Sequence, residues 1–131
     1  FAGSETLLLA TLRAGGAGCI SATANVNPAA IAKLRRDWQE PDADARQAAL
    51  DRVRAAFQRF PMIPALKAAV AHFSGDKSWA TVRPPLVALN EEQWRQLLET
   101  LNALGFAMPG IGLENADDGT ALMPIPSSGC R

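Results

Sequence analysis

Near the start of the chain, the hydrophobic positions repeat with two different spacings. Residues 5–14 carry leucines at the spacing of one helix face, which predicts an amphipathic helix. Residues 18–25 alternate between two kinds of side chain, which predicts a β-strand with two different faces. With residues 1–4 as the end of an earlier strand and 28–39 as a helix, the order is that of consecutive βα units. The expected helix stripe is Leu7, Leu8, Leu9 and Leu12, and the strand faces are Ile20, Ala22 and Ala24 against Cys19, Ser21, Thr23 and Asn25.

Glycine and proline mark the ends of these elements. Gly15 is expected to close the first helix, because the residue after a helix often takes a left-handed conformation that glycine enters without strain. Asn27 is expected to cap the next helix, with Pro28 at its first position. Gly15, Gly16 and Gly18 follow the expected helix and precede the expected strand. A phosphate-binding loop needs the reverse order, so the glycines do not indicate a nucleotide site.

After Pro41 the pattern is helical throughout. Residues 42–60 predict one long amphipathic helix, with Asp42 as its N-cap. Its charged residues are expected on a solvated or interface face. The expected apolar stripe is Ala45, Ala49, Val53, Ala56, Phe57 and Phe60, and the charged face is Arg46, Asp51, Arg52, Arg54 and Arg59.

Two further helices are expected. One covers residues 64–73, and a loop over 74–89 follows it. The second begins at Asn90, where Gln93 three positions later completes the pattern of a capping box, and it ends before Gly105. Its expected stripe is Trp94, Leu97, Leu98, Leu101 and Leu104.

Composition limits the partners. The chain has 131 residues, with 13 Lys and Arg against 13 Asp and Glu, so its zero net charge gives no sign of a nucleic-acid or anionic-membrane partner. Two cysteines, Cys19 and Cys130, do not form the framework of a disulfide-rich secreted domain, and a cytoplasmic location is expected. Neither a membrane-spanning stretch nor a signal peptide is readable. One histidine and two distant cysteines do not match a metal site, and no metal is expected.

Four segments carry a family resemblance: residues 2–5, 15–28, 61–67 and 83–86. Together they resemble the C-terminal part of the dihydrodipicolinate synthase and N-acetylneuraminate lyase family, which are pyruvate-dependent class I aldolases on a (β/α)8 TIM barrel. The resemblance extends over about residues 1–106.

The resemblance implies an α/β fold, a C-terminal fragment of that barrel. Residues 1–39 would form its last two βα units, residues 40–105 a C-terminal helical extension and residues 106–131 an irregular tail. A whole barrel typically needs ~250 residues. The first six units are therefore expected to be absent or to lie in a piece of the protein not given by this sequence.

The resemblance also assigns the substrate-binding residues. Gly3 matches the glycine beside the substrate, and Ile20 the strand residue that flanks bound pyruvate. Ser4 and Glu5 match variable positions that contact the second substrate. Ala22 stands where the sialic acid lyases carry a sugar-binding serine, and alanine cannot make that hydrogen bond. From the residues alone, Gly3 could equally form a tight turn, and Glu5 could be a carboxylate favoured by the first turn of a helix.

No catalytic residue is named in this chain. A class I aldolase needs a lysine with a lowered pKa, and the lysines here are Lys33, Lys67 and Lys77. None matches the Schiff-base lysine, which the resemblance places on the sixth strand, before Phe1. The proton-shuttle tyrosine of the family is also missing, since the chain has no tyrosine.

The expected function is therefore that of a lyase that condenses or cleaves pyruvate, a 2-oxo acid, with an aldehyde, without a cofactor and as a homotetramer. One alternative is a 2-keto-3-deoxy sugar acid aldolase or dehydratase, or an enzyme like N-acetylneuraminate lyase. A second alternative, from a different class, is a non-catalytic helical interaction module.

Overall fold

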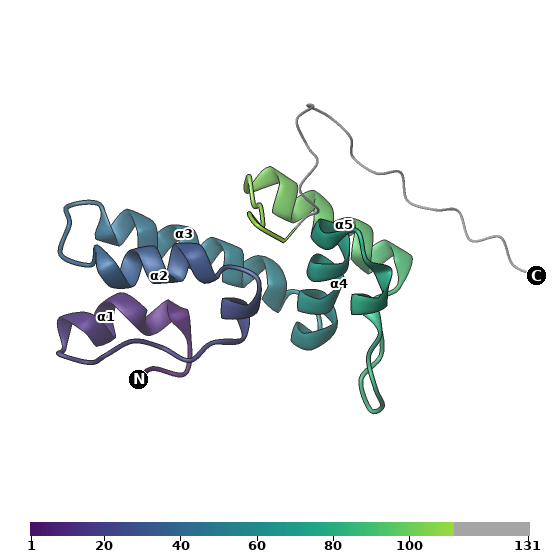
Figure 1. The fold of residues 1–131 in the computed structure, drawn as a ribbon, viewed down its shortest axis with the longest axis horizontal. Coiled ribbons are helices and arrows are strands. Elements are labelled where there is room, and N and C mark those ends of the chain that lie inside the picture. The colour runs from purple at the N-terminus through teal and green to yellow at the C-terminus, as the bar shows by residue number, and fades with distance from the viewer. Residues whose placement is uncertain (112–131) are drawn as a thin grey trace, which may run out of the picture.

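A computed structural model describes residues 1–111, which form a chain of helices (Figure 1). α1, α2 and α3 lie side by side at one end of the molecule, and α4 and α5 pack on the other end of α3. No helix within the described residues has the length and apolar character to cross a membrane. The α-helices are α1 (Leu8–Arg13), α2 (Pro28–Arg36), α3 (Ala43–Gln58), α4 (Met62–Ser74) and α5 (Glu91–Ala103), and the 3-10 helices are η1 (Glu5–Leu7), η2 (Ala22–Asn25) and η3 (Lys77–Ala80).

The expected strands over 1–4 and 18–25 are wrong as extended elements. Within residues 1–111, their pairing is one isolated parallel bridge between Ala2 and Cys19. The Ala2 N–H donates to the Gly18 carbonyl at 2.9 Å, and the Ile20 N–H donates to the Ala2 carbonyl at 2.8 Å. An isolated pair of short strands is marginal, because neither strand has a second neighbour to hydrogen bond. The chain therefore leaves the bridge after Ser21 and closes into η2.

Helix ends follow the glycine and proline signals, but two side-chain caps do not form. Gly15 has a φ of 83° and Pro28 is the first residue of α2, as predicted. The predicted caps Asn27 and Asp42 make no capping hydrogen bond, because their ψ angles of 43° and 6° are not the extended ψ that directs a cap side chain at the helix N–H groups. The Asp42 carboxylate instead accepts from Arg46 at 2.7 Å.

The capping box of α5 is confirmed. The Gln93 N–H donates to Asn90 Oδ1 at 2.9 Å, and the Asn90 N–H donates to Gln93 Oε1 at 3.1 Å. Two N–H groups that the helix cannot satisfy are thereby paired. At the other end Gly105 has a φ of 63°, as expected for a residue that stops a helix.

Two apolar clusters form the interior. The first joins α1, α2 and the start of α3, and the second joins the end of α3 to α4 and α5. The first consists of Leu8, Leu9, Leu12, Leu34, Ala43 and Leu50. The second consists of Val26, Ala56, Phe57, Ala65, Leu66, Ala68, Ala69, Leu97 and Leu101.

The buried stripe of α3 differs from the predicted one. The predicted Ala56 and Phe57 are buried, but the predicted Ala45 and Ala49 are exposed, and Ala43 and Leu50, which were not predicted, are buried. Alanine is small and helix-favouring, so it is tolerated on either face and does not identify the stripe. Leu7 and Leu104, which were predicted in the apolar stripes of two other helices, are also exposed.

Candidate functional site

The predicted substrate-binding residues lie around the Ala2–Cys19 bridge. Gly3 and Ser4 follow Ala2 in the sequence, and Ile20 follows Cys19. The bridge therefore brings the two groups of residues together. Ile20 is 75% exposed, Gly3 and Ala22 are also exposed, and Ser4 is half-buried. These four residues therefore lie at one accessible edge of the described structure.

Gly3 meets no steric demand from the other described residues. Its φ lies outside the left-handed region, and a Cβ built on it would find no atom of residues 1–111 within 4 Å. A tight left-handed turn is thus not the reason for a glycine here. The open space beside it is compatible with the close approach of a group from outside residues 1–111.

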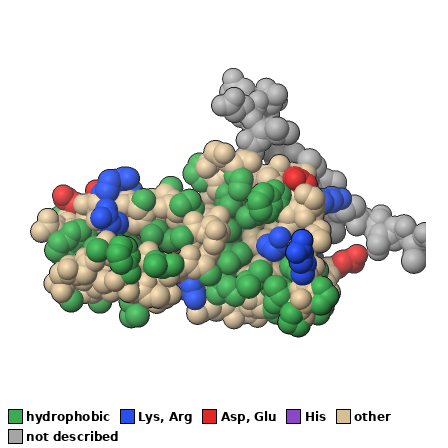
Figure 2. Space-filling view, turned by 60° about the horizontal axis from the view of Figure 1, so that its bottom comes forward, with side chains coloured by type: hydrophobic (Ala, Val, Ile, Leu, Met, Phe, Trp, Pro, Cys, Tyr) green, Lys and Arg blue, Asp and Glu red, His purple; other side chains and the backbone are tan. Residues whose placement is uncertain are grey.

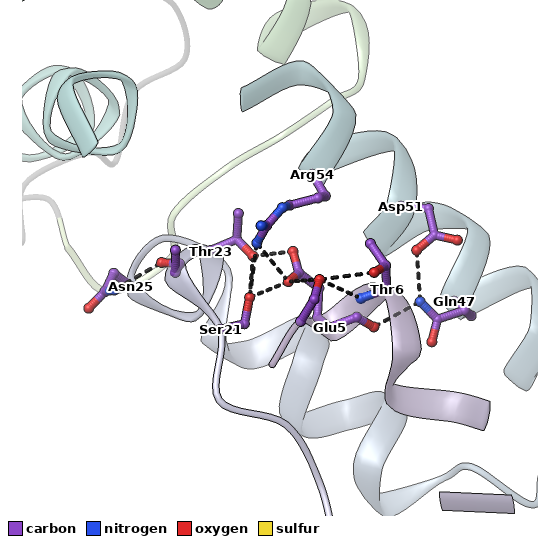
Figure 3. Close-up of polar contacts among 10 residues, drawn as sticks. Glu5, Thr6, Ser21, Thr23, Asn25, Gln47, Asp51 and Arg54 are labelled. Atoms are coloured by element: carbon purple, nitrogen blue, oxygen red, sulfur yellow. Dashed lines mark hydrogen bonds and ion pairs between the residues drawn. The ribbon is translucent and has the colours of Figure 1, made fainter. Parts of the chain in front are cut away.

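Glu5 is the one member of the predicted set that is fully buried, with 1% of its surface exposed. The hydroxyls of Ser21 and Thr23 both donate to its carboxylate (Figure 3). Arg54 Nη1 lies 3.2 Å from Glu5 Oε2, and Ser4 Oγ donates to the same oxygen at 3.4 Å. The carboxylate therefore joins the segment before α1 to the segment around η2.

Opposing effects act on the pKa of Glu5. Burial raises the pKa, whereas the hydrogen bonds from Ser21 and Thr23 and the positive charge of Arg54 lower it, and together these lower the pKa of Glu5 below its ordinary value. The carboxylate is accordingly ionised at neutral pH and acts only as a hydrogen-bond acceptor. In this state Glu5 is a buried anion and not a proton donor.

Two side chains of α3 complete the cluster. Arg54 Nη1 also donates to Ser21 Oγ at 3.2 Å. Gln47 Nε2 donates to the Glu5 carbonyl at 3.0 Å (Figure 3). Gln47 Oε1 accepts from the Leu9 N–H at 3.0 Å. Gln47 and Arg54 are seven residues apart, so they lie on the same face of α3, two turns apart.

Arg54 was expected on a solvated or interface face, and the solvated alternative is wrong for this residue. Its side chain is only 16% exposed and pairs with Glu5. The sequence does contain a signal for this, because the spacing from Ala43 through Gln47, Leu50 and Arg54 to Phe57 is four, three, four and three. Polar residues on such a stripe need buried partners.

The three lysines lie away from this cluster, with no hydrogen bond or ion pair to it in the described part of the chain. Lys33 pairs with Asp37 at 3.0 Å. Lys67 Nζ lies 5.9 Å from the centre of the Trp79 ring, and Lys77 is exposed on η3.

Among the described residues, the other reactive side chains form no site. His72 packs edge-on against Phe73 at 5.1 Å between ring centres, and burial lowers the pKa of its imidazole. Burial and the charge of Glu5 raise the pKa of the Cys19 thiol, which keeps it protonated. Within residues 1–111, no group of three or more His, Cys, Asp or Glu residues is placed to hold a metal ion.

An apolar hollow of about 230 Å³ lies beside the bridge. Phe1, Leu8 and Cys19 form part of its lining, and Phe1 itself is 80% exposed. Figure 2 shows hydrophobic side chains over much of one face of the molecule. Part of the apolar surface is therefore left open in the region of the predicted site.

Curated relatives match most of this chain but only part of their own length. An uncharacterized DapA-like lyase of Halobacterium salinarum is 37% identical over 107 residues, covering 79% of this chain and 34% of the relative. The 4-hydroxy-tetrahydrodipicolinate synthase of Gluconacetobacter diazotrophicus is 31% identical over 108 residues, covering 79% and 35%. The chain thus spans about a third of the length of these relatives.

Solved structures share the fold. Dihydrodipicolinate synthase from Agrobacterium tumefaciens matches with a TM-score of 0.66 and 31% identity, over 78% of this chain and 33% of that protein. YagE, a prophage protein of the dihydrodipicolinic acid synthase family from E. coli K12 solved with pyruvate, matches with a TM-score of 0.69 and 28% identity, over 80% and 36%.

A 2-keto-3-deoxygluconate aldolase of Sulfolobus solfataricus matches with a TM-score of 0.68 and 23% identity, over 79% of this chain and 36% of that protein, which shows a common fold alone. The model of the dihydrodipicolinate synthetase family matches residues 1–104, which confirms the resemblance read from the four sequence segments. The chain belongs to the dihydrodipicolinate synthetase family.

Proposed function

We propose that this chain is the C-terminal part of a Schiff-base-forming lyase of the dihydrodipicolinate synthase type. It would help to condense or cleave pyruvate, or another 2-oxo acid, with an aldehyde. The observation that carries the proposal is the family match over residues 1–104. The similarity to YagE, a protein solved with pyruvate, supports the choice of 2-oxo acid.

In this proposal, residues 1–39 are the last two βα units of a (β/α)8 barrel, residues 40–105 a helical extension and residues 106–131 a tail, of which 112–131 lie outside the described residues. The apolar hollow beside Phe1 and the exposed Ile20 support this arrangement, because the neighbouring units of a closed barrel would cover such surfaces. The working enzyme would be a cytoplasmic homotetramer.

The chain would supply one wall of the substrate pocket. Gly3 and Ile20 would flank the 2-oxo acid, in keeping with the open space at Gly3. Ser4 and Ala22 would border the aldehyde, and Glu5 would support that border from the interior, where its carboxylate is buried.

The Schiff-base lysine is proposed to lie outside residues 1–131. Its amine would attack the ketone carbon of the 2-oxo acid, water would leave, and loss of a proton would give the enamine that adds to the aldehyde. The contribution of this chain is to hold the bound 2-oxo acid and to keep water from it.

Trapping of the longer protein that contains this chain, with pyruvate and sodium borohydride, tests the proposal, because the proposed Schiff-base lysine lies outside residues 1–131. The protein should gain the mass of pyruvate less one oxygen, and peptide mapping should place the adduct on a lysine other than Lys33, Lys67 and Lys77. Borohydride without pyruvate is the control. A protein that gains no adduct would overturn the lyase proposal and favour a helical interaction module. An adduct on Lys67 would overturn the placement of the lysine.

Substitution of Gly3 tests the wall. Gly3→Val adds a side chain into space that no other atom of the described chain fills. We expect adduct formation to fall sharply with no change in melting temperature. Ala45→Val, at an exposed position of α3, is the control and should leave the adduct unchanged. Equal trapping in both variants would remove Gly3 from the pocket.

The second substrate is the open part of the proposal. The alternatives are a 2-keto-3-deoxy sugar acid aldolase or dehydratase and an enzyme like N-acetylneuraminate lyase. Pyruvate release from 2-keto-3-deoxygluconate and from N-acetylneuraminate, measured beside condensation of pyruvate with an aldehyde, would separate them. Because Ala22 has no hydroxyl, N-acetylneuraminate is expected to be the poorest of the three.

A further inference from the structure

Helix α3 projects two polar side chains into the interior at the predicted pocket wall. Gln47 and Arg54 share its buried stripe with Ala43, Leu50 and Phe57. Both contact the segment that carries the predicted substrate-binding residues, and neither stands among those residues itself.

Arg54 contacts both halves of the wall at once. A single nitrogen, Nη1, lies 3.2 Å from Glu5 Oε2 and 3.2 Å from Ser21 Oγ. Glu5 follows Gly3 and Ser4, whereas Ser21 lies between Ile20 and Ala22. The guanidinium therefore bridges the two segments at the point where the Ala2–Cys19 pairing ends.

The rest of the guanidinium is held by little else. Its Nε is buried and has no hydrogen-bond partner within the described residues. A buried donor without a partner destabilises the protein. The contacts of Nη1 with Glu5 and Ser21 must therefore outweigh this loss, which indicates that the position of Arg54 serves the carboxylate.

The side chain of Gln47 binds the backbone of the same segment. Its amide group donates to the Glu5 carbonyl and accepts from the Leu9 N–H, each at 3.0 Å. With Gln47 on the backbone of Glu5 and Arg54 on its carboxylate, α3 contacts this residue at both ends (Figure 3).

We propose that Arg54 is a positioning residue of the pocket. Through Glu5 and Ser21 it holds the segment of Gly3 and the segment of Ile20 in one relative position. This inference rests on the proposed function, since it is the 2-oxo acid that the positioned wall would bind. Displacements near 1 Å can change a rate by about 100-fold, so a residue that only positions others can have a large effect.

The variants separate the effect of the planar guanidinium group of Arg54 from the effect of its positive charge. Arg54→Met removes the charge and the hydrogen bonds, while Arg54→Lys keeps the charge without the planar fork. Arg52→Met is the matched control, because Arg52 is exposed on the same helix and makes no hydrogen bond or ion pair within residues 1–111. If Arg54→Met alone does not fold, the Glu5→Gln/Arg54→Met pair, which removes both charges, takes its place.

Two measurements are made on the longer protein that contains this chain, well below the melting temperature of each variant. The first is amide hydrogen exchange over residues 1–9 and 18–27. The second is the pyruvate concentration that gives half-maximal borohydride trapping. For Arg54→Met we expect faster exchange confined to these two segments, with the half-saturating concentration raised about tenfold or more. Arg54→Lys should fall between wild type and Arg54→Met, and Arg52→Met should match wild type.

The outcomes separate the two proposals. If wild type forms no adduct while Arg54→Met shows the confined exchange, the lyase proposal fails, and the positioning of the two segments stands. If wild type forms the adduct and Arg54→Met has the same half-saturation, the positioning inference is overturned. Exchange that rises equally in α4 and α5 would overturn it as well, because Arg54 would then be a general stabiliser.

Discussion

The two apolar clusters on α3 differ in what lies at their edges. The second cluster packs aromatic rings edge to face, with Phe57 and Phe106 at 6.0 Å and Phe73 and Phe106 at 5.6 Å between ring centres. The first cluster borders the ionised carboxylate of Glu5, which has named partners. Apolar contacts are non-directional and tolerate exchange of similar shapes, whereas a buried ion needs particular donors. Helix α3 therefore combines adaptable apolar contacts with a specific ion contact, which Arg54 makes between Leu50 and Phe57.

The largest effect is expected in the second cluster. Phe57 is fully buried and touches the rings of this cluster, so Phe57→Ala should lower the free energy of unfolding by about 3–5 kcal/mol. Urea unfolding measures the change. Gln58→Ala, at an exposed position of the same helix, is the control. A loss below about 1 kcal/mol would mean that the ring is not a packing centre.

The next effect compares the ion contact of α3 with its apolar contacts. Arg54→Met leaves the buried Glu5 carboxylate without its cation and should destabilise the protein by about 2–3 kcal/mol, less than a fully buried pair, because Arg54 is 16% exposed. Adding Glu5→Gln should restore part of this, since no uncompensated charge remains. A double variant less stable than Arg54→Met would contradict the pairing.

The pH dependence of stability is a further test of the buried Glu5 carboxylate. Because the pKa of Glu5 is lowered in the folded protein, its ionisation stabilises the fold above the unfolded value of about 4.3, and this contribution is lost as pH falls through the folded pKa. The stability difference between wild type and Glu5→Gln should therefore shrink below about pH 4. Unfolding in urea across this range measures it. A difference that is constant with pH would show that Glu5 keeps an ordinary pKa.

Outside both clusters, the capping box should have a moderate effect. Asn90→Ala removes the side-chain oxygen that accepts from Gln93, and we expect a loss of about 1 kcal/mol. Asn90→Ser, which keeps a capping oxygen, should be close to wild type. Thermal unfolding distinguishes the two, and equal losses would show that the cap contributes little.

The smallest effect is expected at the surface. Arg13 and Asp44 form a bidentate pair at 2.9 and 2.7 Å between α1 and α3, but both side chains are exposed. Solvent and salt screen such pairs, so Asp44→Ala should change stability less than Asn90→Ala, and the change should vanish in high salt. A salt-independent loss would indicate a structural role for Asp44 beyond its charge.

Local signals predicted the helices well. The capping box, Gly15 and Gly105 depend on neighbouring residues alone, and the structure confirms all three. The strands were wrong because strand formation depends on hydrogen-bonding partners elsewhere in space. Even so, the alternation that placed Ser21 and Thr23 on one face was informative, since both hydroxyls point to Glu5.

The residues of the candidate site were harder to predict from the sequence than the helices. Gly3, Ser4, Ile20 and Ala22 came from the family resemblance, and their roles remain proposals. Arg54 was missed because α3 carries several arginines, and the pairing depends on which stripe is buried. Alanines on both faces hid that stripe, whereas the larger Leu50 and Phe57 define it.

The length of α3 has a consequence for unfolding. Its 16 residues extend about 24 Å and serve both clusters. Helices shorter than about 12–15 residues are marginal alone, and α1 and α2 have only 6 and 9 residues. The first cluster therefore depends on α3, so α1 and α2 should unfold no later than α3 does. A substitution at Phe57 would thereby reduce the population of intact pocket walls without touching a residue of the wall.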